Sequence, residues 1–485
     1  MALAVLLALA SAAAGATLAG TVVDNLGGRP LARAGVRVEP AGAAGQESTH
    51  SVTADAGGQF QFTELPPGVY LLRAQRSGYA PARYGQKRWN APGTPIVLEA
   101  ETQFAAEIRL RKLGVITGQI LDENRAGLPG HRVTAYRAGP RLQWVAGGEA
   151  DDRGVYRIAG LEPGRYYVRT EGRELEADYS LLPTFYGRVT RAAQAQTVDI
   201  DLEQELSGID IEPLPGRLSA LTGRVQSTRP ATVTLFTDMG AWSSQVVPGG
   251  TFRFDSLAPG RYDLIAEAAG GPEPLAGYQQ VSVSRPVEDI TVFLAPAPWL
   301  QVRCDGGDAS VSLFLRRREP SEEGLRRLLC GERAVLAPGI WEFGVVPGSH
   351  LYVASIANAT PTGTAYEFDL LRHPGLELAV TLRERPATLH GKVTTEGGRP
   401  AVGAPVTLYP LDLELRSRLG GLRSTRSGPE GEYRFLGLAP GKYEVLSSFL
   451  IEDAAEGAWT SGRGRGVSLE EGSEQTLDLV LADQP

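Results

Sequence analysis

Short stretches in which apolar and polar residues alternate recur along the whole chain. Four of them occupy matching places, at residues 59–62, 155–158, 251–254 and 432–435, and each follows a glycine-containing turn such as Asp152-Arg153-Gly154. Alternation with a period of two puts successive side chains on opposite faces, which is typical of a half-buried β-strand. The pattern therefore predicts repeated strand-rich domains.

A second phrase, Leu-x-Pro-Gly-x-aromatic, follows each of these strands and begins another. It also occurs a fifth time without such a strand before it, and its copies are separated by the length of a small domain, roughly 100 residues. Proline presets φ at a turn and glycine accepts φ > 0, so we expect a hairpin connection at each copy. The motif residues are Gly68 and Tyr70, Gly164 and Tyr166, Gly260 and Tyr262, Gly339 and Trp341, and Gly441 and Tyr443.

Further strands complete each repeat. An opening pair is visible at residues 19–24 and 35–38 and again at 117–122 and 131–136, and closing strands are visible at 106–110 and 477–481. About six or seven strands in roughly 95 residues predict an antiparallel β-sandwich. The expected organisation is all-β: five Ig-like sandwiches in tandem at 17–112, 113–214, 215–296, 297–384 and 385–485, of which the third and fourth are degenerate. Very short connections, as at 112–115, predict a stiff rod.

Composition and charge narrow the function classes. Hydrophobic residues make up 42% of the chain, enough for packed cores, while 59 glycines and 33 prolines favour short strands over helices. The net charge is −8, and the sequence has no run of basic residues long enough to follow a phosphate backbone, so nucleic acid is not an expected partner. One segment, residues 316–329, has acids near its start and bases near its end, which predicts a short amphipathic helix.

The N-terminus and the cysteines indicate the compartment. Residues 2–14 are apolar and uncharged and are followed by Ala14-Gly15-Ala16, which predicts a secretory signal peptide at 1–16. No Lys or Arg precedes this run, which leaves open a start codon upstream of Met1. No later run reaches the length of a membrane helix. We expect an exported protein, in the periplasm, at the outer surface or outside the cell. There Cys304 and Cys330 are expected to form a disulfide, the alternative being two buried free thiols.

These phrases together resemble the carboxypeptidase regulatory-like domain, a transthyretin-like sandwich in the carbohydrate-binding-like fold group. The first repeat carries the resemblance best, through Gly20-Thr21-Val22, residues 30–36, residues 55–62 and the phrase ending at Tyr70. The resemblance implies the fold and says little about activity. The metallocarboxypeptidase that the family name refers to binds zinc through His-x-x-Glu and a distant His. None of the five histidines has that spacing: His50, His131, His350, His373 and His390.

Sugar binding on a β-sandwich typically uses exposed aromatic rings, so tryptophans outside the repeated phrase are the candidate glycan-binding residues: Trp89, Trp144, Trp242 and Trp459. Trp89 lies in the polar loop 84–90, which offers a flat ring beside hydrogen-bonding groups. The alternative for each tryptophan is packing over the edge of its own sandwich. Trp341 takes the tyrosine position of the phrase and is expected in the core.

Chemistry-bearing motifs are otherwise weak. There is no Gly-x-Ser-x-Gly, and the acidic residues Asp24, Asp55, Asp151 and Asp152 fit turn positions. We therefore predict no catalytic residue, metal or cofactor. The leading hypothesis is an exported non-enzymatic scaffold that binds a glycan or a cell-envelope protein. The alternative is a cryptic hydrolase, or an accessory or inhibitory protein associated with a protease.

Overall fold

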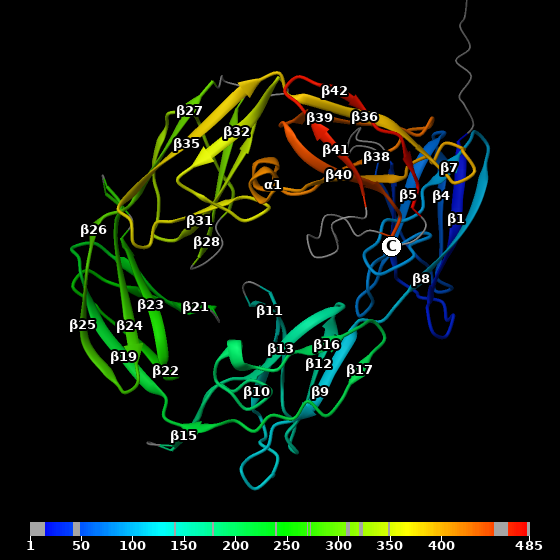
Figure 1. Ribbon diagram of the computed structural model, residues 1–485. Helices are drawn as coiled ribbons and strands as arrows, with labels where there is room; N and C mark the ends of the chain where they lie inside the picture. Colours follow the sequence, from blue (N-terminus) through cyan, green and yellow to red (C-terminus); the bar gives the residue numbers. More distant parts are fainter. Residues whose placement is uncertain are drawn as a thin grey trace, which may run out of the picture.

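The computed structural model describes residues 15–41, 49–139, 142–176, 179–237, 240–268, 270–271, 273–306, 311–319, 324–347, 350–450 and 464–482 (Figure 1). Nearly all of the predicted signal peptide lies outside these residues. Within them the chain forms five successive strand-rich units, each with its own hydrophobic core between two main sheets, and unit 2 has a third small sheet of β14 (Arg173–Glu176), β15 (Tyr179–Leu181) and β18 (Pro215–Gly216). The predicted fold class, a tandem array of β-sandwich domains, is confirmed.

The strands of the units follow one another along the chain. Unit 1 contains β1 (Ala16–Asp24), β2 (Gly35–Pro40), β3 (His50–Thr53), β4 (Gln59–Leu65), β5 (Gly68–Gln75), β6 (Ala82–Arg83), β7 (Ile96–Leu98) and β8 (Gln103–Leu110). Unit 2 contains β9 (Gly114–Gln119), β10 (Arg132–Arg137), β11 (Gln143–Glu149), β12 (Val155–Leu161), β13 (Gly164–Thr170), β14 (Arg173–Glu176), β15 (Tyr179–Leu181), a 3-10 turn (Ala192–Gln194), β16 (Val198–Ile200), β17 (Glu205–Leu206) and β18 (Pro215–Gly216).

The remaining units repeat this plan. Unit 3 contains β19 (Ser219–Gln226), β20 (Ala231–Thr237), β21 (Gly240–Val246), β22 (Thr251–Leu257), β23 (Gly260–Ala268), β24 (Leu275–Val283), β25 (Val287–Phe293) and β26 (Ala295–Pro296). Unit 4 contains β27 (Trp299–Asp305), β28 (Ser312–Glu319), β29 (Arg326–Leu328), β30 (Arg333–Val335), β31 (Ile340–Val346), β32 (Leu351–Ala357), β33 (Thr360–Pro361), β34 (Tyr366–Asp369) and β35 (Gly375–Glu384). Unit 5 contains β36 (Ala387–Thr394), β37 (Pro405–Pro410), α1 (Leu413–Leu419), β38 (Arg423–Arg426), β39 (Glu432–Leu438), β40 (Gly441–Ser447), β41 (Arg465–Leu469), β42 (Glu474–Thr476) and β43 (Leu479–Val480).

One topology recurs. In unit 1 the first sheet has the order β4-β1-β8 and the second has β2 between β3 and β5, and the other units repeat both arrangements. The opening strand pairs antiparallel with β4 and parallel with the closing strand β8. The first sheet is therefore mixed, whereas all pairs in the second sheet are antiparallel, as predicted. Residue alternation reveals that a strand is half-buried but carries no information about the direction of its neighbour.

A glycine in the opening strand makes this close pairing possible. A β-carbon at Gly20 would overlap the carbonyl oxygen of Ala106, and one at Gly118 would overlap that of Ile209. Gly391 in unit 5 faces the carbonyl of Leu477 in the same way. The glycine of the Gly-x-Val phrase is thus required by the close approach of the closing strand.

The Leu-x-Pro-Gly-x-aromatic phrase forms a hydrogen-bonded corner in all five units. The aromatic side chain donates a hydrogen bond to the carbonyl oxygen four residues earlier: Tyr70 to Pro66 at 2.8 Å, Tyr166 to Glu162 at 2.7 Å, Tyr262 to Ala258 at 2.8 Å, Tyr443 to Ala439 at 2.6 Å, and the Trp341 indole to Ala337 at 3.1 Å. Trp341 is buried. The phrase therefore encodes both a turn and the bond that closes it.

The glycine of this phrase behaves differently from expectation in three units. Gly164 and Gly441 have positive φ, at 157° and 158°. Gly68, Gly260 and Gly339 do not, so the prediction of φ > 0 is wrong there. At Gly339 the constraint is space instead, because a β-carbon would overlap the carbonyl oxygen of Glu319.

The helix predicted at 316–329 is wrong. Most of its described residues lie in β28 and β29, which pair antiparallel, and none of them is helical. The apparent helical charge pattern arises from partners across the sheet: the Arg316 guanidinium lies 2.7 Å from the Glu342 carboxylate on β31. Among the described residues the α-helix is α1, where the Asp412 carboxylate accepts a hydrogen bond from the Leu415 amide and Gly420 ends the helix at φ 76°.

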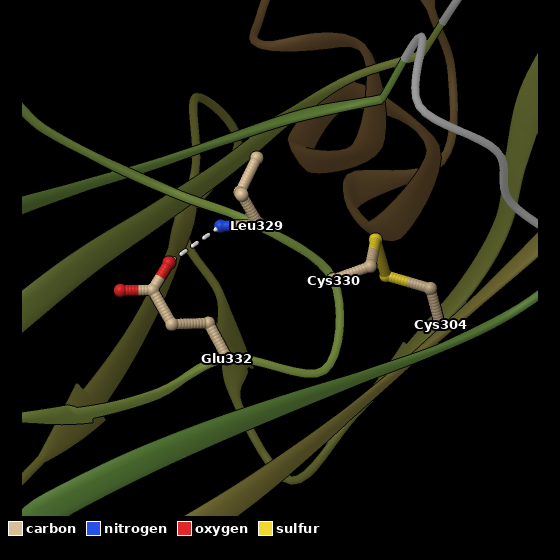
Figure 2. The surroundings of a disulfide bond; sticks show 4 residues. All are labelled: Cys304, Leu329, Cys330 and Glu332. Carbon is tan, nitrogen blue, oxygen red and sulfur yellow. Dashed lines mark hydrogen bonds between the residues drawn. A yellow bond between two sulfur atoms is a disulfide. The ribbon is translucent and has the colours of Figure 1, made fainter.

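Cys304 and Cys330 form a disulfide in unit 4 (Figure 2). It joins β27 to the turn that precedes β30, with the two Cα atoms 5.6 Å apart. The same turn is held by a 3.0 Å hydrogen bond from the Leu329 amide to the Glu332 carboxylate. Both cysteines pack against the core of the unit.

The five units curve into a ring rather than a rod, and unit 5 returns to unit 1 (Figure 1). A β-carbon at Gly403 of unit 5 would lie 2.6 Å from Cγ of Pro95 in unit 1, which places the Gly403 backbone close to the Pro95 ring. The rod prediction is wrong because short connections restrict hinge motion but do not determine the angle between neighbouring units. Contacts across each junction set it, as where the Gly363 amide of unit 4 donates to the Ser417 hydroxyl of unit 5. No helix in the described part of the chain has the length and apolarity to cross a membrane.

Candidate binding cleft between units 1 and 2

A cleft of about 370 Å³ lies where unit 1 meets unit 2. Unit 1 contributes β6, the loop that follows it, part of β8 and Asn25 after β1, and unit 2 contributes Leu202. The Trp89 side chain is half-buried in its lining. This volume falls within the range of small-ligand sites in proteins.

The loop that carries Trp89 is braced by its own side chains. The Arg83 amide donates to the Gln86 side-chain oxygen at 2.8 Å, and the Gln86 side-chain amide donates to the Arg88 carbonyl at 2.5 Å. The Arg83 guanidinium donates to the Ala91 carbonyl at 3.2 Å. Gly85 has φ 66° and lies against Thr94, so a side chain there would clash. The indole is therefore presented on a fixed backbone.

Glu203 of unit 2 anchors two other lining residues, Asn25 and Arg111. Its carboxylate accepts hydrogen bonds from the Asn25 side-chain amide, at 3.2 Å to each oxygen, and from Nε of Arg111 at 3.1 Å. Asp24 braces the same corner, because its carboxylate accepts from the Gly27 amide and the Tyr79 hydroxyl. These hydrogen bonds, the backbone one first, hold the pKa of Asp24 below its ordinary value.

The charge of the lining is strongly positive. Its cations are Arg83, Lys87, Arg88, Arg109 and Arg111, and its carboxylate is Glu107. Arg109 is paired with Glu107 at 2.7 Å, and Arg111 with Glu203. Lys87 and Arg88 are exposed and form no ion pair with any carboxylate that the structure describes. Sequence reasoning missed Glu107 and Arg109 of β8 as site residues, although their outward positions in an alternating strand are a usable signal.

The four candidate tryptophans are not brought together. Trp89 lines the cleft, whereas Trp144 lies on β11 of unit 2 with 63% of its surface exposed. Trp242 belongs to β21 of unit 3, and Trp459 lies outside the described residues. A sixth tryptophan that the sequence reasoning passed over, Trp299, is half-buried, and the Arg333 guanidinium lies 4.0 Å from its ring centre.

Titratable side chains outside the cleft form no metal site among the described residues, and His131 serves a structural role. Within the described ranges no three His, Cys, Asp or Glu side chains gather as a metal site would require. His131 is buried, and its Nε2 donates to the Glu171 carbonyl at 3.0 Å. Burial lowers the pKa of His131, which favours the neutral ring.

Among known proteins and families, the first unit has a family match. Residues 17–111 match the family model of the carboxypeptidase regulatory-like domain. No curated protein sequence matches the chain. Solved structures similar to it include a minor pilin of Streptococcus agalactiae (13% identity, TM-score 0.26, covering 42% of this chain and 98% of the pilin) and the shaft pilin SpaA of Lactobacillus rhamnosus GG (13%, 0.26, 42% and 97%). The major pilin BcpA of Bacillus cereus also matches (10%, 0.17, 76% and 99%). Scores this low carry no information about what the chain binds.

Proposed function

We propose that this chain, whose residues 17–111 match the carboxypeptidase regulatory-like domain, is an exported non-enzymatic scaffold that binds carbohydrate in the cleft between units 1 and 2. The observation that carries the proposal is the half-buried Trp89 ring, held on a braced loop inside a cleft of about 370 Å³. Flat apolar rings beside fixed polar groups are the elements of a sugar site, because a pyranose has an apolar face and a polar rim.

The cleft offers binding groups of several kinds. The Trp89 indole N–H donates no hydrogen bond to any residue that the structure describes, so it is available to a ligand hydroxyl. Asn25 and Arg111 are fixed by Glu203, so their positions do not have to be ordered when a ligand binds. Such preorganisation lowers the entropic cost of binding.

The scaffold part of the proposal concerns the whole array. The Cys304–Cys330 disulfide supports an oxidising, exported location, because disulfides persist in such compartments. Separate cores in the five units support independent folding within the predicted boundaries 17–112, 113–214, 215–296, 297–384 and 385–485. Limited proteolysis tests these boundaries, since cleavage first inside a unit rather than between units would contradict them.

Tryptophan fluorescence titration with an oligosaccharide panel tests the binding proposal. We expect saturable quenching by at least one saccharide, lost in Trp89→Ala and retained in Trp144→Ala. Trp144 is the control because it is also a candidate tryptophan but does not line the cleft. Equal loss in both variants, or no saturation with any saccharide, would reject the cleft as a sugar site. Turnover of an ester, peptide or glycoside by the full chain would reject the non-enzymatic part.

A further inference from the structure

The charge of the cleft is opposite to the charge of the protein. The whole chain carries −8, yet five cationic side chains and one carboxylate line the cleft. Such a local reversal concentrates positive potential over the cleft and attracts anions to it. A neutral ligand would gain little from it.

Two cations that form no ion pair with any described carboxylate lie next to the aromatic residue in the chain. Lys87 and Arg88 immediately precede Trp89 in the same loop, and both line the cleft. Arg83 and Arg111 serve instead to brace the loop and the junction. The Arg88 carbonyl is fixed by Gln86, so the backbone that carries the charges is held together with the ring.

We infer that the cleft selects acidic saccharides, in which an anionic substituent lies beside the apolar face of a sugar ring. The inference rests on the proposed function and specifies its ligand class. Trp89 covers the ring face, while Lys87 and Arg88 pair with the substituent, a carboxylate as in a uronic acid or a sulfate ester. Arg109 is paired with Glu107, so it adds less than its formal charge to the positive potential of the cleft.

Isothermal titration of the full chain with three oligosaccharides of equal length tests the inference: an oligouronate, a sulfated oligosaccharide and a neutral glucan. We expect at least tenfold tighter binding of one or both acidic ligands than of the glucan at low salt, weakening as salt is added. In Lys87→Gln/Arg88→Gln this preference should fall about tenfold. The control Arg261→Gln/Arg285→Gln removes two exposed cations from unit 3, outside the cleft, and should change nothing.

The possible results distinguish a preference for acidic saccharides from sugar binding as such. Equal binding of all three saccharides that still requires Trp89 would overturn the acidic preference and leave the sugar site standing. No binding of any saccharide would overturn both. A polyglutamate peptide that binds as tightly as the oligouronate, and equally well in Trp89→Ala, would show that the cleft recognises charge alone and would overturn the saccharide assignment.

Discussion

Removing one hydroxyl group tests whether the repeated phrase stabilises each unit through its corner. Tyr443→Phe keeps the ring and deletes the donor to the Ala439 carbonyl, at a place where both residues are buried. The matched control is Tyr136→Phe on β10, because the Tyr136 hydroxyl makes no hydrogen bond with any residue that the structure describes.

The expected cost follows from the burial of the bond. A protein hydrogen bond contributes about 0.5–1.5 kcal/mol net, and a buried carbonyl left without its donor costs about 1–3 kcal/mol. Tyr443 has no exposed surface, so water cannot replace the lost hydroxyl. We expect the free energy of unfolding of unit 5 to fall by about 1–3 kcal/mol. For a domain of this size that lowers the melting temperature by roughly 5–20 °C.

Differential scanning calorimetry of the full chain measures the effect, and hydrogen exchange assigns the shifted transition to unit 5. The transitions of the other units should stay in place. Trp341→Phe repeats the experiment in unit 4, where the indole N–H replaces the hydroxyl. If Tyr443→Phe changes the unfolding of unit 5 no more than Tyr136→Phe changes that of unit 2, the corner hydrogen bond has no energetic role and the reasoning is refuted.

Three further predictions concern the disulfide, the ring and alkaline pH. Reduction, or Cys304→Ser/Cys330→Ser, should lower the free energy of unfolding of unit 4 by roughly 3.5 kcal/mol, because the disulfide closes a 26-residue separation. Calorimetry should show one transition shifted to lower temperature, and adding reductant to the double variant should shift it no further. Pro95→Arg, which puts a charge at the contact with Gly403, should raise the radius of gyration in small-angle X-ray scattering; an unchanged value would mean that this contact does not close the ring. Burial raises the pKa of Tyr443, so the unfolded chain loses that proton first above about pH 10; stability should fall from there upward, and less steeply in Tyr443→Phe.

The fold was predictable because its signals are local. Alternation identifies β4 and β12, and the Pro-Gly turn joins each to the next strand. Both act within a few residues of the chain, so a sequence contains them completely. The direction of the closing strand is not local: β8 lies parallel to β1 because the chain crosses between sheets first, and no residue pattern in β8 records that path.

The charged segment at 316–329 illustrates the same limit. Acids and bases three or four residues apart are compatible with a helix, but they are equally compatible with pairs across a sheet. Alternation along the strand decides between them, because Leu313 and Leu315 are buried while Phe314 between them is only partly buried. The Arg316–Glu342 pair joins two strands that the intervening chain separates, so the sequence alone could not reveal it.

The candidate site could be predicted only in part, and the reason lies in the junction. Trp89 could be predicted as a candidate because an aromatic ring in a polar loop is a local feature of the sequence. The cleft itself needs Glu203 of unit 2 to hold Asn25 and Arg111 of unit 1, and that contact joins residues far apart in the chain. The loop ends at Pro95, which meets Gly403 of unit 5. Unit 2 therefore holds the part of the site at Asn25 and Arg111, and unit 5 contacts the end of the Trp89 loop at Pro95, so the shape of the site depends on neighbouring units as well as on the unit that supplies its ring.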